Sequence, residues 1–248
     1  MPLARRKGDA RLSHRFGRWL SALSLGLAVP CLAITPAAAP AAHGCGPRGY
    51  AYAGVQSRSG ADGISATLAA VAQPLVERGH VAAWVGVGSP DEGPGGTAEW
   101  IQAGLNSEPG TPSRLYYEVT RAGKEPAYVE LDSDVAAGVK HHVAVLEVAS
   151  QPNVWRIWLD GRAASHAIYL PRSHRRLTPM AIAESWDGGA PACNRYAYRF
   201  GRVSLAAAPG GSWRTLAHAD VVQDPGYRVM RSADASFLAV TQPPLPGA

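Results

Sequence analysis

Short runs of alternating apolar and polar residues recur along most of the chain and are separated by segments rich in glycine and proline. The runs are rich in Val, Ile, Tyr, Trp and Thr, which favour strands, and no sustained helical periodicity or internal repeat is present. The pattern predicts an all-β fold, a β-sandwich. Strands are predicted over 50–56, 63–70, 80–88, 97–106, 113–121, 126–132, 141–150, 154–159, 162–170, 177–186 and 198–207, with two more near the C-terminus.

Two local signals refine this prediction. Residues 154–162 read as a strand that runs into Asp160-Gly161, a dipeptide that suits a two-residue hairpin turn. The alanines between Ile64 and Leu75 fit a short amphipathic helix, but Thr67 and the stop at Pro74 fit a strand and a loop as well, and a strand is favoured.

Alternation also assigns side chains to faces, because successive residues of a strand point to opposite sides of the sheet. Tryptophan, glutamine and glutamate recur on one side of four predicted strands. If these strands are neighbours, that side is a groove lined by aromatic residues with a few polar groups, as in many ligand sites. The alternative is that the tryptophans only pack a core and the polar residues only face water. The residues on this side are Ala82, Trp84, Gly86, Gly88, Trp100, Gln102, Gly104, Asn106, Arg114, Tyr116, Glu118, Met180, Ile182, Glu184 and Trp186.

The N-terminal 42 residues are typical of a secretion signal peptide. Basic residues up to Arg18 precede an apolar stretch from Trp19 to Ile34, and small residues follow at 37–42. Pro30 interrupts the stretch, so cleavage after Ala39 or Ala42 is favoured over a stable membrane anchor. We expect a secreted, extracellular monomer with one domain, residues 43–248, whose tail is disordered from about residue 242.

Removal of this segment changes the charge balance. It holds six of the 24 Lys and Arg residues and one of the 19 Asp and Glu residues, which leaves 18 of each in the mature chain. The basic excess that would favour a nucleic-acid partner is therefore confined to the signal, and no nucleic-acid partner is expected.

The cysteines indicate a disulfide. Cys31 lies in the predicted signal, so the mature chain keeps Cys45 and Cys193, an even number in an oxidising compartment. A bridge between them would close a loop of more than 140 residues, which the chain-entropy model values at roughly 4 to 5 kcal/mol. Two free thiols are the alternative.

Four motifs in order resemble those of the glutamic peptidases, the eqolisin family: Trp84-Val85-Gly86-Val87, Trp100-Ile101-Gln102-Ala103-Gly104, Tyr116-Tyr117-Glu118 and Ala183-Glu184-Ser185-Trp186. The resemblance implies a concanavalin A-like jelly roll, a sandwich of two large antiparallel sheets. It also implies a catalytic pair, Gln102 and Glu184, on the concave sheet. The substrate-binding residues would be Trp84, Trp100, Tyr116, Glu118 and Trp186. One departure is Gly88, which stands where the family has an acidic residue.

The implied chemistry is the hydrolysis of a polypeptide. A desolvated Glu184 carboxylate would take a proton from the attacking water, and the Gln102 amide would donate a hydrogen bond to the developing oxyanion. This chemistry requires no cofactor and no metal, and the carboxylate clusters at Asp91-Glu92 and at 132–134 read as solvated turns.

Two other functions remain open. A non-catalytic module could bind cell-wall carbohydrate on a platform of Trp84, Trp100, Tyr116 and Trp186. A glycoside hydrolase could use Glu118 and Glu184 as its two carboxylates.

Overall fold

The computed structural model describes residue 45 and residues 49–188, 193–232 and 234–245. The predicted signal peptide, residues 1–42, lies outside the described residues. The described part of the chain forms strands and no helix, so no helix in it is long and apolar enough to cross a membrane.

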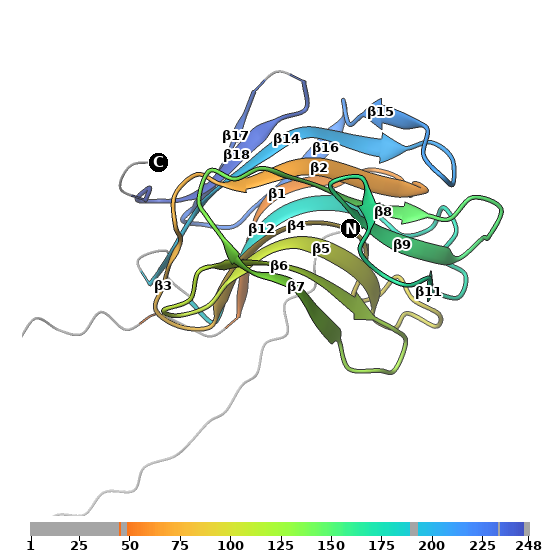
Figure 1. Ribbon diagram of the computed structural model, residues 1–248, viewed down its shortest axis with the longest axis horizontal. Helices are drawn as coiled ribbons and strands as arrows, with labels where there is room; N and C mark the ends of the chain where they lie inside the picture. The colour runs from red at the N-terminus through yellow and green to blue at the C-terminus, as the bar shows by residue number, and fades with distance from the viewer. Residues whose placement is uncertain (1–44, 46–48, 189–192, 233, 246–248) are drawn as a thin grey trace, which may run out of the picture. The chain divides into compact units, whose positions relative to one another are not determined.

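The first sheet has seven strands in the order β16-β1-β12-β4-β5-β6-β7, and every neighbouring pair is antiparallel. Figure 1 shows β1, β12, β4, β5, β6 and β7 as successive curved ribbons. Their bounds are β1 (Tyr50–Ser57), β4 (His80–Ser89), β5 (Glu99–Ser107), β6 (Ser113–Thr120), β7 (Ala127–Val135), β12 (Pro179–Trp186) and β16 (Ala219–Gln223).

The second sheet has nine strands. Seven follow the order β10-β9-β8-β2-β14-β18-β17, while β11 pairs with β9 and β15 pairs with β14. A separate pair joins β3 (Leu75–Val76) to β13 (Asn194–Arg195). The bounds in the second sheet are β2 (Gly63–Ala70), β8 (His141–Glu147), β9 (Val154–Leu159), β10 (Arg162–Ala163), β11 (Ile168–Tyr169), β14 (Ala197–Ala206), β15 (Trp213–Thr215), β17 (Tyr227–Arg231) and β18 (Phe237–Thr241).

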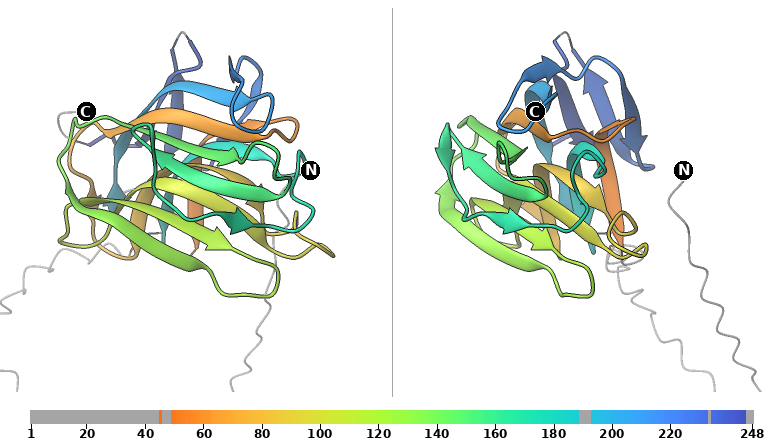
Figure 2. Two further views of the ribbon diagram at one scale, coloured as in Figure 1. Left: turned by 45° about the vertical axis from the view of Figure 1, so that its right-hand side comes forward. Right: turned by 90° about the vertical axis from the view of Figure 1, so that its right-hand side faces the viewer.

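The two sheets pack face to face, as the two views of Figure 2 show, and one apolar core lies between them. The first sheet contributes every second residue of its central strands, for example Val85 on β4 and Ile101 on β5, both fully buried. The second sheet contributes Ile64 and Trp155, also fully buried. Burial of each such side chain contributes about 1.5 to 3 kcal/mol, so the alternation predicted from the sequence is what holds the layers together. The prediction of a two-sheet antiparallel β-sandwich is confirmed.

The predicted hairpin is also confirmed. Leu159 pairs with Arg162, and Asp160 (φ 49°) and Gly161 (φ 79°) both have positive φ, as a two-residue type I′ turn requires. The Asp160 carboxylate accepts a hydrogen bond of 2.7 Å from the backbone N–H of His142. The turn is thereby tied to β8 as well as to β9.

The other predicted strands differ from the observed ones mainly in where they begin and end. The segment read as either helix or strand forms β2, and the predicted strand 162–170 is split into β10 and β11. The strand predicted over 141–150 stops at Glu147, because Ser150 and Asn153 take positive φ values in the turn that follows.

Cys45 and Cys193 form the expected disulfide, with their Cα atoms 5.4 Å apart. The bridge fastens Cys45, which precedes β1 in the chain, to the residue directly before β13. Past β18, the backbone N–H of Gln242 donates to the carbonyl of Gly226, and Leu245 is buried. The tail that was expected to be disordered therefore packs against the sandwich as far as Leu245.

Candidate functional site

The face of the seven-stranded sheet that points away from the core carries the candidate chemistry; we call it the outer face. Its middle is a second apolar cluster made of Ala82, Trp84, Tyr116 and Ile182, with Tyr52, Met180 and Val222 packed against it. Gln102 and Glu184 lie on this same face and are both nearly buried, at 9% and 5% exposure. Alternation along the strands therefore assigned the faces correctly.

The strand register determines which of these residues are neighbours across the sheet. Gln102 on β5 pairs with Gly86 on β4, and Gly86 pairs with Met180 on β12. On the other side Gln102 pairs with Glu118 on β6. A Cβ atom at Gly86 would lie 2.9 Å from the Gln102 Cβ, so only glycine leaves this part of the floor open. Gln102 thus faces Met180 across a glycine.

Glu184 belongs to a different row of the sheet. It pairs with Tyr52 on β1 and with Ala82 on β4, and Ala82 pairs with Asn106 on β5. Glu184 is therefore two strands and four residues away from Gln102, an offset that in a flat sheet would put their Cα atoms about 16 Å apart. The row containing Trp84 lies between the two.

Four polar side chains in the middle of the face are hydrogen-bonded in two pairs. The Gln102 amide Nε2 donates a hydrogen bond of 3.1 Å to the hydroxyl of Tyr116, and the Trp100 indole N–H donates one of 3.1 Å to Glu118. Among the described residues, the buried indole N–H of Trp84 has no hydrogen-bond partner. The face therefore holds one unused donor between Gln102 and Glu184.

Glu184 lies among aromatic rings at one end of the face. Its carboxylate is 3.3 Å from Nε2 of His80, and the His80 ring stacks on Trp186 with a centroid distance of 5.6 Å. Tyr50 stacks on Tyr52 at 5.7 Å and contacts Trp186 at 6.3 Å. Tyr50 and Trp186 form the exposed rim, with 53% and 39% of their surface accessible.

Burial and negative charge both act on the ionisable groups of this face. Burial raises the pKa of Glu118, the hydrogen bond from Trp100 opposes that rise, and the charge of Glu184 adds to it. Burial, followed by the charge of Glu184, raises the pKa of Tyr50 to about 12 and that of Tyr116 well above its ordinary value. The charge of Glu184 thus acts on residues of several strands of this face.

Solved structures with the same arrangement of strands identify the fold. Two are crystal structures of scytalido-glutamic peptidase, one with a peptide-based transition state analog and one with a transition state analog inhibitor. They match with TM-scores of 0.55 and 0.57, each at 15% identity. The third is SCP-B, described as a member of the eqolisin family of peptidases in a complex with the tripeptide Ala-Ile-His, with a TM-score of 0.51 and 16% identity.

The chain has the glutamic-peptidase fold. Each of the three matches covers 79% of this chain and 100% of the other. No family model and no curated protein matches the sequence. The fold predicted from the four ordered motifs is therefore confirmed by structure, although the sequence identity is only 15% to 16%.

Within this glutamic-peptidase fold, all seven residues predicted for the site lie on the outer face, but they divide into two groups. Trp100, Gln102, Tyr116 and Glu118 are linked by hydrogen bonds and direct pairing on β5 and β6. Glu184 and Trp186 lie at the other end, on β12, and Trp84 lies between the groups. Glu118 and Glu184, the pair considered for glycoside hydrolysis, are three strands apart.

Sequence reasoning overlooked His80, Tyr50 and Tyr52, which surround Glu184. The signal was present, because His80 continues the alternation of Ala82 and Trp84 by one step, and the two tyrosines alternate in the first strand. What was missing was the knowledge that β1 lies beside β12.

Two clusters among the described residues have the composition of metal ligands. In one, two of the three residues are the disulfide-bonded Cys45 and Cys193. The other is Asp62, Glu147 and His174, where the His174 ring is 2.6 Å from Glu147 and Arg175 donates to Asp62. Both carboxylates, those of Asp62 and Glu147, are already paired with a histidine or arginine side chain, so we interpret this cluster as an ion-pair network.

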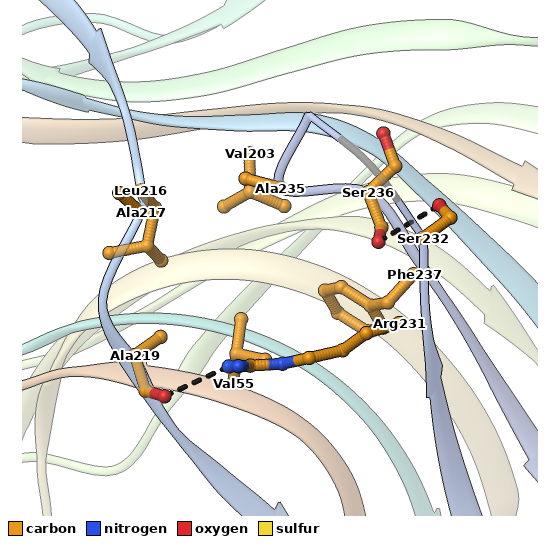
Figure 3. A pocket seen from close by; sticks show the side chains of 10 residues that line it. All are labelled: Val55, Val203, Leu216, Ala217, Ala219, Arg231, Ser232, Ala235, Ser236 and Phe237. Carbon is orange, nitrogen blue, oxygen red and sulfur yellow. Dashed lines mark hydrogen bonds between the residues drawn. The ribbon is translucent and has the colours of Figure 1, made fainter.

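A small cavity lies apart from the predicted site, beside β16 and β17 (Figure 3). Its wall mixes apolar side chains, such as Val55 and Phe237, with polar groups, and Arg231 crosses it to donate a hydrogen bond of 2.8 Å to the carbonyl of Ala219. None of the seven predicted site residues lines it, so it adds nothing to the chemistry of the outer face.

Proposed function

We propose that this protein is exported after removal of residues 1–42 and binds an extended polypeptide on the outer face of its seven-stranded sheet, without cleaving it through Gln102 and Glu184. The observation that carries the proposal is the register, which places Met180 and not an acid across Gly86 from Gln102. The Cys45–Cys193 disulfide is consistent with an oxidising compartment.

The case for polypeptide rests on the lining of the face and on the similar structures. Exposed aromatic rings stand at both ends, Tyr50 and Trp186 at one and Tyr128 at the other. Polar side chains lie between them, including the half-buried Glu118 and the nearly buried Gln102. The structures of the same fold were solved with a tripeptide and with a peptide-based analog. An extended chain across the strands would meet both kinds of group.

The case against hydrolysis by the predicted pair rests on position. A general base and an oxyanion donor must both reach one reacting centre, within about 3 Å of the groups involved. Here Gln102 donates to Tyr116, and Glu184 lies two strands away beside His80. The large side chain of Trp84 lies between them.

The test is to incubate the purified mature protein with a denatured, unrelated protein and with fluorescent decapeptides between pH 2 and 7. Binding should be measurable by fluorescence anisotropy, with no cleavage detected by mass spectrometry. Cleavage by the wild type that is lost in Glu184→Gln and Gln102→Ala would overturn the claim that these two residues do not hydrolyse the bound polypeptide. Absence of binding to any peptide would overturn the polypeptide part.

Carbohydrate binding is the second candidate, and one observation favours it. Tyr116 and Tyr128 stack nearly parallel at 5.2 Å, and Tyr128 is 43% exposed, which offers a flat surface to a sugar ring. Retention on insoluble cell-wall polysaccharide, lost in Tyr128→Ala and in Trp186→Ala while peptides fail to bind, would select this function instead.

A further inference from the structure

The end of the outer face around Glu184 combines a nearly buried carboxylate with four aromatic rings. We call Tyr50, Tyr52, His80, Glu184 and Trp186 the Glu184 corner. The carboxylate is 5% exposed, and three of the four surrounding rings are within 6.3 Å of one another by centroid distance. Tyr50 also stacks on Tyr52 at 5.7 Å. An acid therefore lies at the base of a partly exposed aromatic wall.

The corner carries negative charge that the described residues only partly balance. His80 is the one basic side chain recorded in contact with Glu184 among the described residues, at 3.3 Å, and an imidazole is charged only when protonated. Arg114, the nearest arginine along the same row, is engaged with Glu108 at 3.3 Å and with Glu130 at 3.6 Å. The charge of Glu184 also contributes, after burial, to the raised pKa of both Tyr50 and Tyr52.

A second hydrogen-bond acceptor, the side chain of Asn106, lies on the same face. Asn106 lies in the row of Glu184, on the far side of Ala82, and its side-chain oxygen is buried without a hydrogen-bond partner among the described residues. Two strand spacings, about 10 Å, separate the backbones of Asn106 and Glu184. Ala82 between them and the Asn106 oxygen are both buried, so a donor reaches that oxygen only by entering the row beside Glu184.

These groups select for a cation. A buried carboxylate and an unpaired carbonyl oxygen both require donors, and the faces of tyrosine and tryptophan attract ammonium and guanidinium groups. A lysine or arginine side chain supplies donors at its tip, and its methylene groups can lie against aromatic rings. An acidic or a purely apolar side chain would leave the Glu184 charge without a partner.

We propose that the Glu184 corner is a subsite for a lysine or arginine side chain of the bound polypeptide. This inference rests on the proposed function, since it assigns a preference to the same face. Glu184 pairs with the cation, Asn106 accepts a second hydrogen bond from it, and Tyr50 and Trp186 cover its aliphatic part. No covalent step is involved.

The experiment compares the affinity of the mature wild-type protein for matched decapeptides in which one position is lysine or norleucine, or arginine or citrulline. The cationic member of each pair should bind about 10- to 100-fold more tightly, as expected for a charged hydrogen bond in a partly buried site. In Glu184→Gln this preference should fall to less than about threefold.

Glu125→Gln serves as the control, because it makes the same change of charge in an exposed loop. It should keep the full preference. Equal affinity of the wild type for lysine and norleucine peptides would overturn the subsite and leave polypeptide binding standing, whereas failure of both peptides to bind would overturn the two proposals together. The wild-type comparison decides the matter even if Glu184→Gln does not fold.

Discussion

Gln102 and Met180 face each other across Gly86 in one row of the seven-stranded sheet. Both side chains lie on the outer face, and the glycine between them has no side chain to fill the gap. On the Gly86 side, the residue that could complete a hydrolytic pair with the Gln102 amide is the one at position 180, where the chain has a thioether that can neither take nor give a proton. The acid on the other side of Gln102, Glu118, accepts a hydrogen bond from the Trp100 indole.

Met180→Glu should therefore introduce cleavage of denatured protein that the wild type lacks. The new carboxylate would face Gln102 over Gly86 and could act as base towards a water between them. Adding Gln102→Ala should then lower the new rate by about 10²- to 10³-fold, the cost of one lost oxyanion donor. Cleavage is followed by mass spectrometry between pH 2 and 7. Met180→Gln, which has no proton to exchange, is the control, and an inactive Met180→Glu that folds and binds peptide would contradict the assignment.

Glu118→Gln should make the protein more stable at neutral pH. Burial raises the pKa of Glu118 in the folded state, so the folded protein holds this proton more tightly than the unfolded chain. The wild type consequently loses stability as the pH rises from the ordinary glutamate value to the raised folded value. Glutamine keeps an acceptor for the Trp100 indole and does not titrate.

Urea unfolding at a series of pH values measures this effect. The gain of Glu118→Gln should be present at neutral pH and should vanish at a pH low enough to protonate Glu118 in both states. Glu125→Gln, in an exposed loop, should show no such dependence. A gain of the same size at every pH would refute the electrostatic explanation.

Loss of the Cys45–Cys193 disulfide in a double serine variant should lower the free energy of unfolding by about 4 to 5 kcal/mol. The bridge joins residues 148 positions apart, so it removes much freedom from the unfolded chain. For a domain of this size the loss corresponds to a fall in Tm of about 8 to 20 °C. Calorimetry of the variant and of reduced wild type should agree, and a fall in only one of them would speak against the chain-entropy account.

Gly161→Ala should destabilise the protein by about 1 to 2 kcal/mol. Gly161 has φ +79°, and a Cβ atom added there would meet no heavy atom within 4 Å, so the cost is that of the left-handed backbone alone. Gly161→Asn should cost less, because asparagine tolerates this conformation. Urea unfolding of both variants measures the difference, and equal costs would indicate that the turn is not held as type I′.

The alternation of apolar and polar residues was sufficient to predict the strands and the faces of their side chains. Trp100 and Gln102 were placed on one side of β5, and Glu184 and Met180 on one side of β12, because a strand has a period of two wherever it lies. The Asp160-Gly161 turn was equally local, since its backbone angles depend on the two residues themselves. The Cys45–Cys193 pairing followed from the even number of cysteines expected after removal of the signal.

The order of the strands in each sheet and the register of their pairing were determined only by the tertiary structure. Nothing local to Tyr50 or His80 indicates that β1 and β4 flank β12, or that Gly86 and not Ala82 lies between Gln102 and position 180. Pairing between strands remote in the chain depends on the packing of the whole core, and a shift by two residues keeps every side chain on its face while changing its neighbours. The sequence by itself therefore determined which residues share the outer face, and the fold decided which of them meet.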